Sequence, residues 1–151
     1  MPKTFELIIA TPERQVYKDV VESVTLPTTT GYITVLANHV ALSTILKAGE
    51  LVITKNGTAE PYAIGGGFLE VQGNQLVVLA DTAEHVTEID QQRVDEAIAR
   101  AKKLKEEIRE DHSEYASVTA KLERDLARLH VIRKHAHRGH QGIPYEGVRK
   151  D

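Results

Sequence analysis

The feature that most constrains the fold of this 151-residue chain is a change of hydrophobic period near Ala83. Before Ala83, short apolar-rich runs are separated by turn residues and alternate with a period near two, which is typical of β-strands. After it, apolar residues recur every three or four positions in a sequence rich in Ala, Glu, Lys and Arg, which is typical of amphipathic helices. The sequence therefore predicts an α+β chain in which a β domain precedes a helical one.

The β half contains several candidate strands bounded by turn residues. Asn56-Gly57 and Gly73-Asn74 mark two of the turns, because both dipeptides tolerate the positive φ that tight hairpins require. We therefore expect an antiparallel β-sandwich of about ten strands over residues 3–86. The candidate strands are Phe5–Thr11, Arg14–Lys18, Val20–Leu26, Gly31–Leu36, Leu42–Leu46, Leu51–Lys55, Pro61–Ile64, Phe68–Gln72 and Leu76–Ala80.

The helical half, residues 87–136, carries two amphipathic stripes joined by about four polar residues, which predicts an antiparallel helical hairpin. Thr87 and Asp90 stand where their side chains can accept from free amides of the first turn. The first stripe is rich in Ala, so we expect a weakly held hairpin that is able to open. Residues 137–151 lack periodicity and are expected to form a flexible tail. The stripes are Val94, Ala97, Ile98, Ala101, Leu104 and Ile108, then Tyr115, Val118, Leu122, Leu126, Leu129 and Ile132.

Composition excludes several classes of function. A net charge of -3 and a pI near 6.2 give no general attraction to nucleic acid or to an anionic membrane. The absence of cysteine excludes disulfides and thiol chemistry. We find no apolar run of signal-peptide length and none of about 18 residues, so we expect no direct membrane insertion. His135, His137 and His140 cluster without a carboxylate or thiol to complete a ligand set, which favours a solvated tail over a metal site.

Catalytic motifs are also missing. Gly65-Gly66-Gly67-Phe68 is not followed by Gly-Lys-Ser/Thr and leads into a strand, so we interpret it as a glycine corner where the chain bends or another backbone approaches. No Gly-x-Ser-x-Gly nucleophile elbow and no paired carboxylates can be identified. The sequence therefore predicts a binding or regulatory protein rather than an enzyme.

The basic residues of the hairpin are the candidate binding groups. Asp90, Arg93 and Arg100 lie near one face of the first helix, and Arg124 and Arg128 share a face of the second. Folded together, these faces could offer guanidinium groups to a polyphosphate, with Asp90 accepting from a base or ribose. The alternative is a solvated face with intrahelical ion pairs. Residues 121–138 carry six Lys or Arg against two acidic residues, a local charge of +4, which would seek an acidic partner surface.

Three segments resemble one known family, the epsilon subunit of bacterial F-type ATP synthases. The first is Gly-Tyr-Ile-Thr-Val-Leu-Ala-Asn-His-Val-Ala-Leu at 31–42, and the second is Gly-Gly-Phe-Leu-Glu-Val at 66–71 followed by Val-Val-Leu-Ala-Asp-Thr-Ala-Glu at 77–84. The third is Ile-Asp-Gln-Gln-Arg-Val at 89–94. The likeness covers about residues 3–134, in order and at the expected spacing.

The resemblance implies a non-catalytic subunit at the cytoplasmic face of the bacterial plasma membrane, peripheral through the synthase complex. Its sandwich would bind the gamma subunit and rest on the c-ring, with Tyr32 and His39 as partner-binding residues. Its folded helices would permit turnover, whereas extended helices would insert between the alpha and beta subunits and inhibit ATP hydrolysis.

Some members of the family also bind a regulatory ATP at the folded hairpin. The matching positions here are Ile89, Asp90, Arg93, Arg100, Arg124 and Arg128. The alternative function is a free-standing ATP-sensing module whose hairpin closes on the nucleotide.

Overall fold

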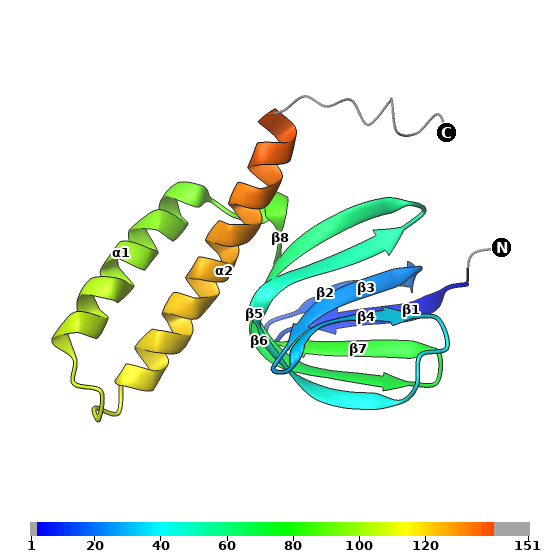
Figure 1. Cartoon of the computed structure of the whole chain (residues 1–151), viewed down its shortest axis with the longest axis horizontal. Helices are drawn as coiled ribbons and strands as arrows, with labels where there is room; N and C mark the ends of the chain where they lie inside the picture. The colour runs from blue at the N-terminus through cyan, green and yellow to red at the C-terminus, as the bar shows by residue number, and fades with distance from the viewer. Residues whose placement is uncertain (1–2, 141–151) are drawn as a thin grey trace.

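The computed structural model describes residues 3–140, with side chains as far as His135. A β-sandwich is followed by two helices that stand side by side along one flank of it (Figure 1), which confirms the predicted α+β class. The strands are β1 (Phe5–Ala10), β2 (Gln15–Val21), β3 (Ser23–Thr28), β4 (Gly31–Leu36), β5 (Leu42–Lys55), β6 (Thr58–Gln72), β7 (Gln75–Ala80) and β8 (Ala83–His85); they are followed by the 3-10 turn η1 (Val86–Glu88) and the helices α1 (Gln91–Glu107) and α2 (Tyr115–His140).

The sandwich forms because β5 and β6 are long enough to take part in both layers. The strand order is β2-β1-β7-β6-β5-β3-β4, with β8 added to β6. The first layer contains β2, β1, β7, the end of β6 and the start of β5. The second layer contains β4, β3, β8, the start of β6 and the end of β5. Side chains that alternate inward from both layers make the core. Its most deeply buried members include Leu7, Ile9, Val24, Leu26, Leu51, Ile53, Ile64, Leu69, Leu76 and Val78.

The predicted number of strands was too high. Residues 42–46 and 51–55 lie in one strand, β5, and residues 61–64 and 68–72 lie in one strand, β6, so residues 3–140 contain eight strands. The breaks in the sequence pattern near Gly49 and Gly66 are bends within strands, because β5 and β6 remain paired on both sides of them.

Two details of the predicted pairing were also wrong. β1 and β7 pair in parallel, from Glu6 with Gln75 to Ala10 with Leu79, so the sandwich is not fully antiparallel. Turn signals reveal only pairing between neighbouring strands, and these two strands are far apart in the chain. The predicted strand at residues 20–26 is divided at Glu22, where the chain passes from one layer to the other.

The glycine corner in β6 is confirmed. Gly66 and Gly67 have φ values of 101° and 143°, which side chains of L residues rarely adopt. A Cβ at Gly67 would collide with the backbone of Leu79, and a Cβ at Gly65 would collide with Arg124 of α2. The missing side chains therefore let β6 bend beside β7 and let α2 lie close to the bend.

Helix α1 begins as predicted, because the Asp90 carboxylate accepts a hydrogen bond of 3.2 Å from the Arg93 N–H. Thr87 does not cap this helix; it lies in η1, and its hydroxyl is hydrogen-bonded at 2.8 Å to Nδ1 of His85, the last residue of β8. α2 continues to His140, beyond the predicted end at residue 136. The rest of the predicted tail, 141–151, lies outside the described residues.

Helix α2 lies between α1 and the sandwich, and the hairpin is antiparallel as predicted (Figure 1). One face of α2 packs on α1 through a small core of Val94, Ile98, Ala101, Leu122 and Ile132. The opposite face turns to β5, β6 and β8, and this second contact was not predicted. It is formed by Arg124, Ala127, Arg128, Val131, Lys134 and His135, which recur at helical spacing.

Candidate functional site

The outer face of the first layer is an exposed apolar surface. Ile45 of β5, Phe68 of β6 and Leu79 of β7 are direct neighbours across the strands, and they are 58%, 40% and 53% exposed. Val20 on β2 is 49% exposed. Ordinary alternation would place polar residues on a solvated face. We call Ile45, Phe68 and Leu79 the apolar row.

The apolar row continues toward the helices. A groove of about 990 Å³ runs between the row and α2, and it is lined by all three row residues and by Leu126. Leu126 is 40% exposed, although its position in the predicted apolar stripe suggested burial against α1. A partner seated on the row would therefore reach α2 as well as the sandwich.

The hairpin forms a second candidate site at its base. Five of the six predicted nucleotide-binding residues line one pocket of about 550 Å³: Ile89, Asp90, Arg93, Arg100 and Arg128. Arg93 is highly exposed and lies 3.8 Å from the Asp90 carboxylate. The predicted juxtaposition of α1 and α2 residues is therefore present for these five residues.

The sixth residue, Arg124, does not line this pocket, because its side chain lies over Gly65 of β6. Arg128 lines the pocket, but its guanidinium is paired with Glu84 at 2.5 Å and with Asp125 at 2.6 Å. Asp125 is 2% exposed, and its Oδ2 is buried without a hydrogen-bond partner. In this conformation the pocket has acidic walls, and one of its arginines is already engaged.

The predicted partner-binding residues Tyr32 and His39 are not brought together. Tyr32 is the second residue of β4, and His39 follows the other end of this strand, whose six residues span about 20 Å. Tyr32 is 59% exposed and lies beside β5, where its hydroxyl accepts from the Glu50 N–H at 3.4 Å. His39 is half-buried in the loop after β4, next to the exposed Leu36 and Val40.

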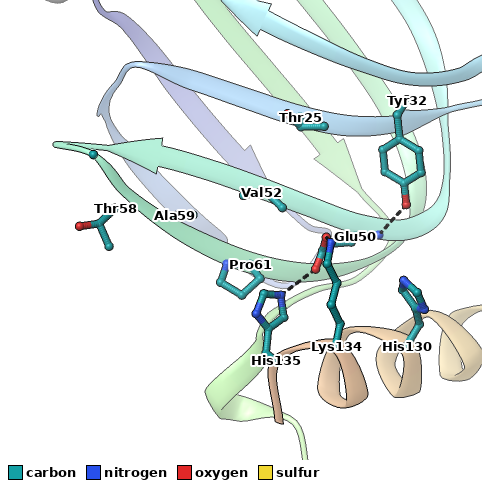
Figure 2. A pocket seen from close by; sticks show the side chains of 11 residues that line it. Thr25, Tyr32, Glu50, Val52, Thr58, Ala59, Pro61, His130, Lys134 and His135 are labelled. Atoms are coloured by element: carbon teal, nitrogen blue, oxygen red, sulfur yellow. Dashed lines mark hydrogen bonds and ion pairs between the residues drawn. The ribbon is translucent and has the colours of Figure 1, made fainter. Parts of the chain in front are cut away.

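Sequence reasoning missed Glu50, which is only 5% exposed although it lies on the outer face of the second layer. Lys134 Nζ donates to its Oε1 at 2.7 Å, and His135 Nε2 lies 2.8 Å from its Oε2 (Figure 2). Burial alone would raise the pKa of Glu50, but these hydrogen bonds and charges outweigh burial and hold the pKa below its ordinary value. The only signal in the sequence was the basic end of α2, which had no assigned acidic partner.

Among the side chains that the structure describes, those of residues 3–135, no group of three or more His, Cys, Asp or Glu is placed to hold a metal ion; His137 and His140 of the predicted cluster lie outside them. Within residues 3–140, neither helix combines the length and the apolar character needed to cross a membrane.

Residues 4–86 match the family described as "ATP synthase, Delta/Epsilon chain, beta-sandwich domain". The chain is 40% identical over 129 residues to the "ATP synthase epsilon chain" of Chloroflexus aggregans, covering 85% of this chain and 92% of that protein. It is 40% identical over 138 residues to the protein of the same name from Caldanaerobacter subterraneus, covering 89% and 98%. The similarity to both relatives therefore extends from the sandwich into the helices.

Two solved structures share the fold. A chain in the mitochondrial ATP synthase of Euglena gracilis, solved as an OSCP/F1/c-ring assembly, has a TM-score of 0.71 at 22% identity, over 84% of this chain and 80% of that one. A chain in the central stalk and c-ring of the Tetrahymena thermophila mitochondrial enzyme has a TM-score of 0.51 at 14% identity, over 89% and 98%.

Proposed function

Since this chain belongs to the ATP synthase epsilon chain family, whose members are non-catalytic subunits, we propose that its sandwich joins the gamma subunit to the c-ring and that its helices restrain ATP hydrolysis. The family serves ATP synthesis and proton transport. The proposed location is the cytoplasmic face of the bacterial plasma membrane, where the chain would be held peripherally through the complex.

The observation that carries the proposed stalk contact is the apolar row. An exposed apolar surface on a sheet face is a candidate protein interface, because burying it removes apolar area from water. The gamma subunit is the proposed occupant, since the similar folds of known structure lie in assemblies that contain F1 or the central stalk.

Phe68→Asp tests this contact because it places a carboxylate in the middle of the apolar row. We expect binding to the cognate gamma subunit to weaken by about tenfold or more in a titration of purified subunits. Leu104→Asp is the matched control, since Leu104 is 43% exposed but lies on α1, away from the row. Equal affinities for Phe68→Asp and the unmodified chain would refute this assignment.

For the c-ring, we propose the end of the sandwich at His39, where Leu36 and Val40 are 56% and 75% exposed. Tyr32 is proposed to contribute from the other end of β4, along the same strand. Replacing Val40 by Asp should impair assembly with the c-ring while leaving the affinity for gamma unchanged. Loss of both contacts together would instead indicate a folding defect.

The proposed restraint on hydrolysis rests on a hairpin that can separate from a self-sufficient sandwich. The sandwich core cluster draws on residues 5–83, and the hairpin has its own small core. Released helices would carry their basic residues to the alpha and beta subunits, where an acidic segment of beta would attract them. A chain that ends at Ile89 should assemble normally but raise the rate of ATP hydrolysis of the reconstituted enzyme; an unchanged rate would exclude the restraint.

A second proposed function, an ATP-sensing hairpin, is favoured by the five candidate residues that share the hairpin pocket. We expect weak binding, because Glu84 and Asp125 compete with phosphate for Arg128. Titration calorimetry on the isolated chain tests it, with Arg93→Ala as the variant expected to lose binding. No heat at millimolar ATP would exclude this function.

A further inference from the structure

Glu50 is a buried carboxylate whose burial depends on a neighbouring helix. It lies on β5, on the outer face of the second layer, where Ala63 and then Glu84 follow it across the sheet. Such a position faces water unless another element covers it. The covering element is α2, whose Lys134 and His135 project from the helix to the two carboxylate oxygens (Figure 2).

The surroundings hold Glu50 in place for this contact. Its N–H donates to the Tyr32 hydroxyl, and Gly49 leaves room for Pro27 and Tyr32 to lie against the bend of β5. The titratable side chains that face Glu50 are Tyr32 from β4 and His130, Lys134 and His135 from α2. Both carboxylate oxygens therefore have partners on α2.

The energetic consequence depends on whether α2 is packed or released. While α2 is packed, loss of one partner would leave a buried charge unsatisfied, which is strongly unfavourable. Once α2 has left, water reaches Glu50 and its charge needs no partner. The contact therefore favours the packed state without penalising the released one.

We propose that Glu50 is a latch, which fixes the C-terminal part of α2 to the sandwich and sets the ratio of released to packed hairpin. Hydrogen bonds to charged groups have strengths that correspond to a factor of about ten or more in this ratio. The latch also neutralises Lys134, so a released helix presents a cation that the packed helix does not. The latch would control how readily the proposed restraint on hydrolysis is applied. Its effect on the packing of α2 is independent of that proposal, and only its effect on the rate of ATP hydrolysis rests on it.

Double electron–electron resonance tests the latch in the full chain, which has no cysteine of its own. Spin labels at Gln72→Cys on β6 and Ser117→Cys on α2 report separation of the helix, and both positions are exposed. Glu50→Gln should raise the ratio of released to packed chains about tenfold. Glu70→Gln is the matched control, because Glu70 is an exposed carboxylate of β6 on the first layer.

A second variant protects the test against a folding defect of Glu50→Gln. Lys134→Gln with His135→Gln removes the same contact from the helix side, where the side chains are 41% and 20% exposed. Unchanged distance distributions in this double variant would overturn the latch. If the distances shift but the rate of ATP hydrolysis by the reconstituted enzyme does not change, the latch is supported and the proposed restraint on hydrolysis is refuted.

Discussion

Replacing Ile98 with Ala should weaken the packing of α1 on α2 without disturbing the sandwich. Ile98 is 7% exposed in the small core between α1 and α2. The substitution removes three carbons, about 2.4 kcal/mol of transfer free energy at roughly 0.8 kcal/mol per carbon, before any cavity term. The other buried residues of α1 are Val94 and Ala101, so the substitution removes the largest buried side chain of this helix.

Hydrogen exchange measured by mass spectrometry resolves the two parts of the chain. Amides of residues 91–107 should exchange about fifty-fold faster, which is 2.4 kcal/mol expressed as an opening equilibrium. Amides of residues 5–80 should keep their rates, because the two core clusters share no residue. Leu104→Ala is the control, since this exposed residue of α1 should change the rates by no more than about twofold. Equal acceleration in α1 and the sandwich would refute the independence of the two cores.

Three further predictions concern the sandwich. Gly67→Ala should destabilise it by about 2–3 kcal/mol in urea titrations, because a Cβ would meet the Leu79 carbonyl at a φ of 143°; equal stability would contradict this. Burial, together with the Glu60 charge, raises the pKa of Tyr62 to about 12. The stabilisation of the fold by the neutral Tyr62 phenol should therefore be complete below pH 10 and be lost as pH rises through 12. In an absorbance titration, the phenolate band of Tyr62 should appear only at this higher pH. Because the pKa of Glu50 is lowered, its stabilising effect should be present above pH 4.5 and fade below it; the stability gap to Glu50→Gln should shrink in acid.

The sequence predicted elements well where the evidence for them is local. The turns at Asn56-Gly57 and Gly73-Asn74 are hairpins, with φ values of 51°, 74° and 60° at Asn56, Gly57 and Gly73. The Asp90 cap and the two helical periods also correspond to structure. These features depend on residues close in sequence, so spacing and residue type are sufficient to find them.

Non-local features escaped prediction for a physical reason. The parallel pairing of β1 with β7 depends on contacts between strands far apart in the chain, and a bend inside β5 or β6 has the same residue signature as a turn. The second buried face of α2 was missed because Arg128, Lys134 and His135 form much of it. Charged residues at helical spacing usually indicate a solvated face, and only the positions of Glu50 and Glu84 in the folded sheet reveal their partners.

The two faces of α2 differ in a way that suits movement. Leaving the sandwich uncovers Ala127 and Val131, but most of the α2 side chains it releases are charged and become solvated by water. The face toward α1 is apolar, so the two helices should remain packed together until a partner covers this face with another apolar surface. Glu50 and Glu84 then compete directly with any acidic partner for Lys134 and Arg128. Weakening these pairs should therefore increase both the release of α2 and its affinity for such a partner.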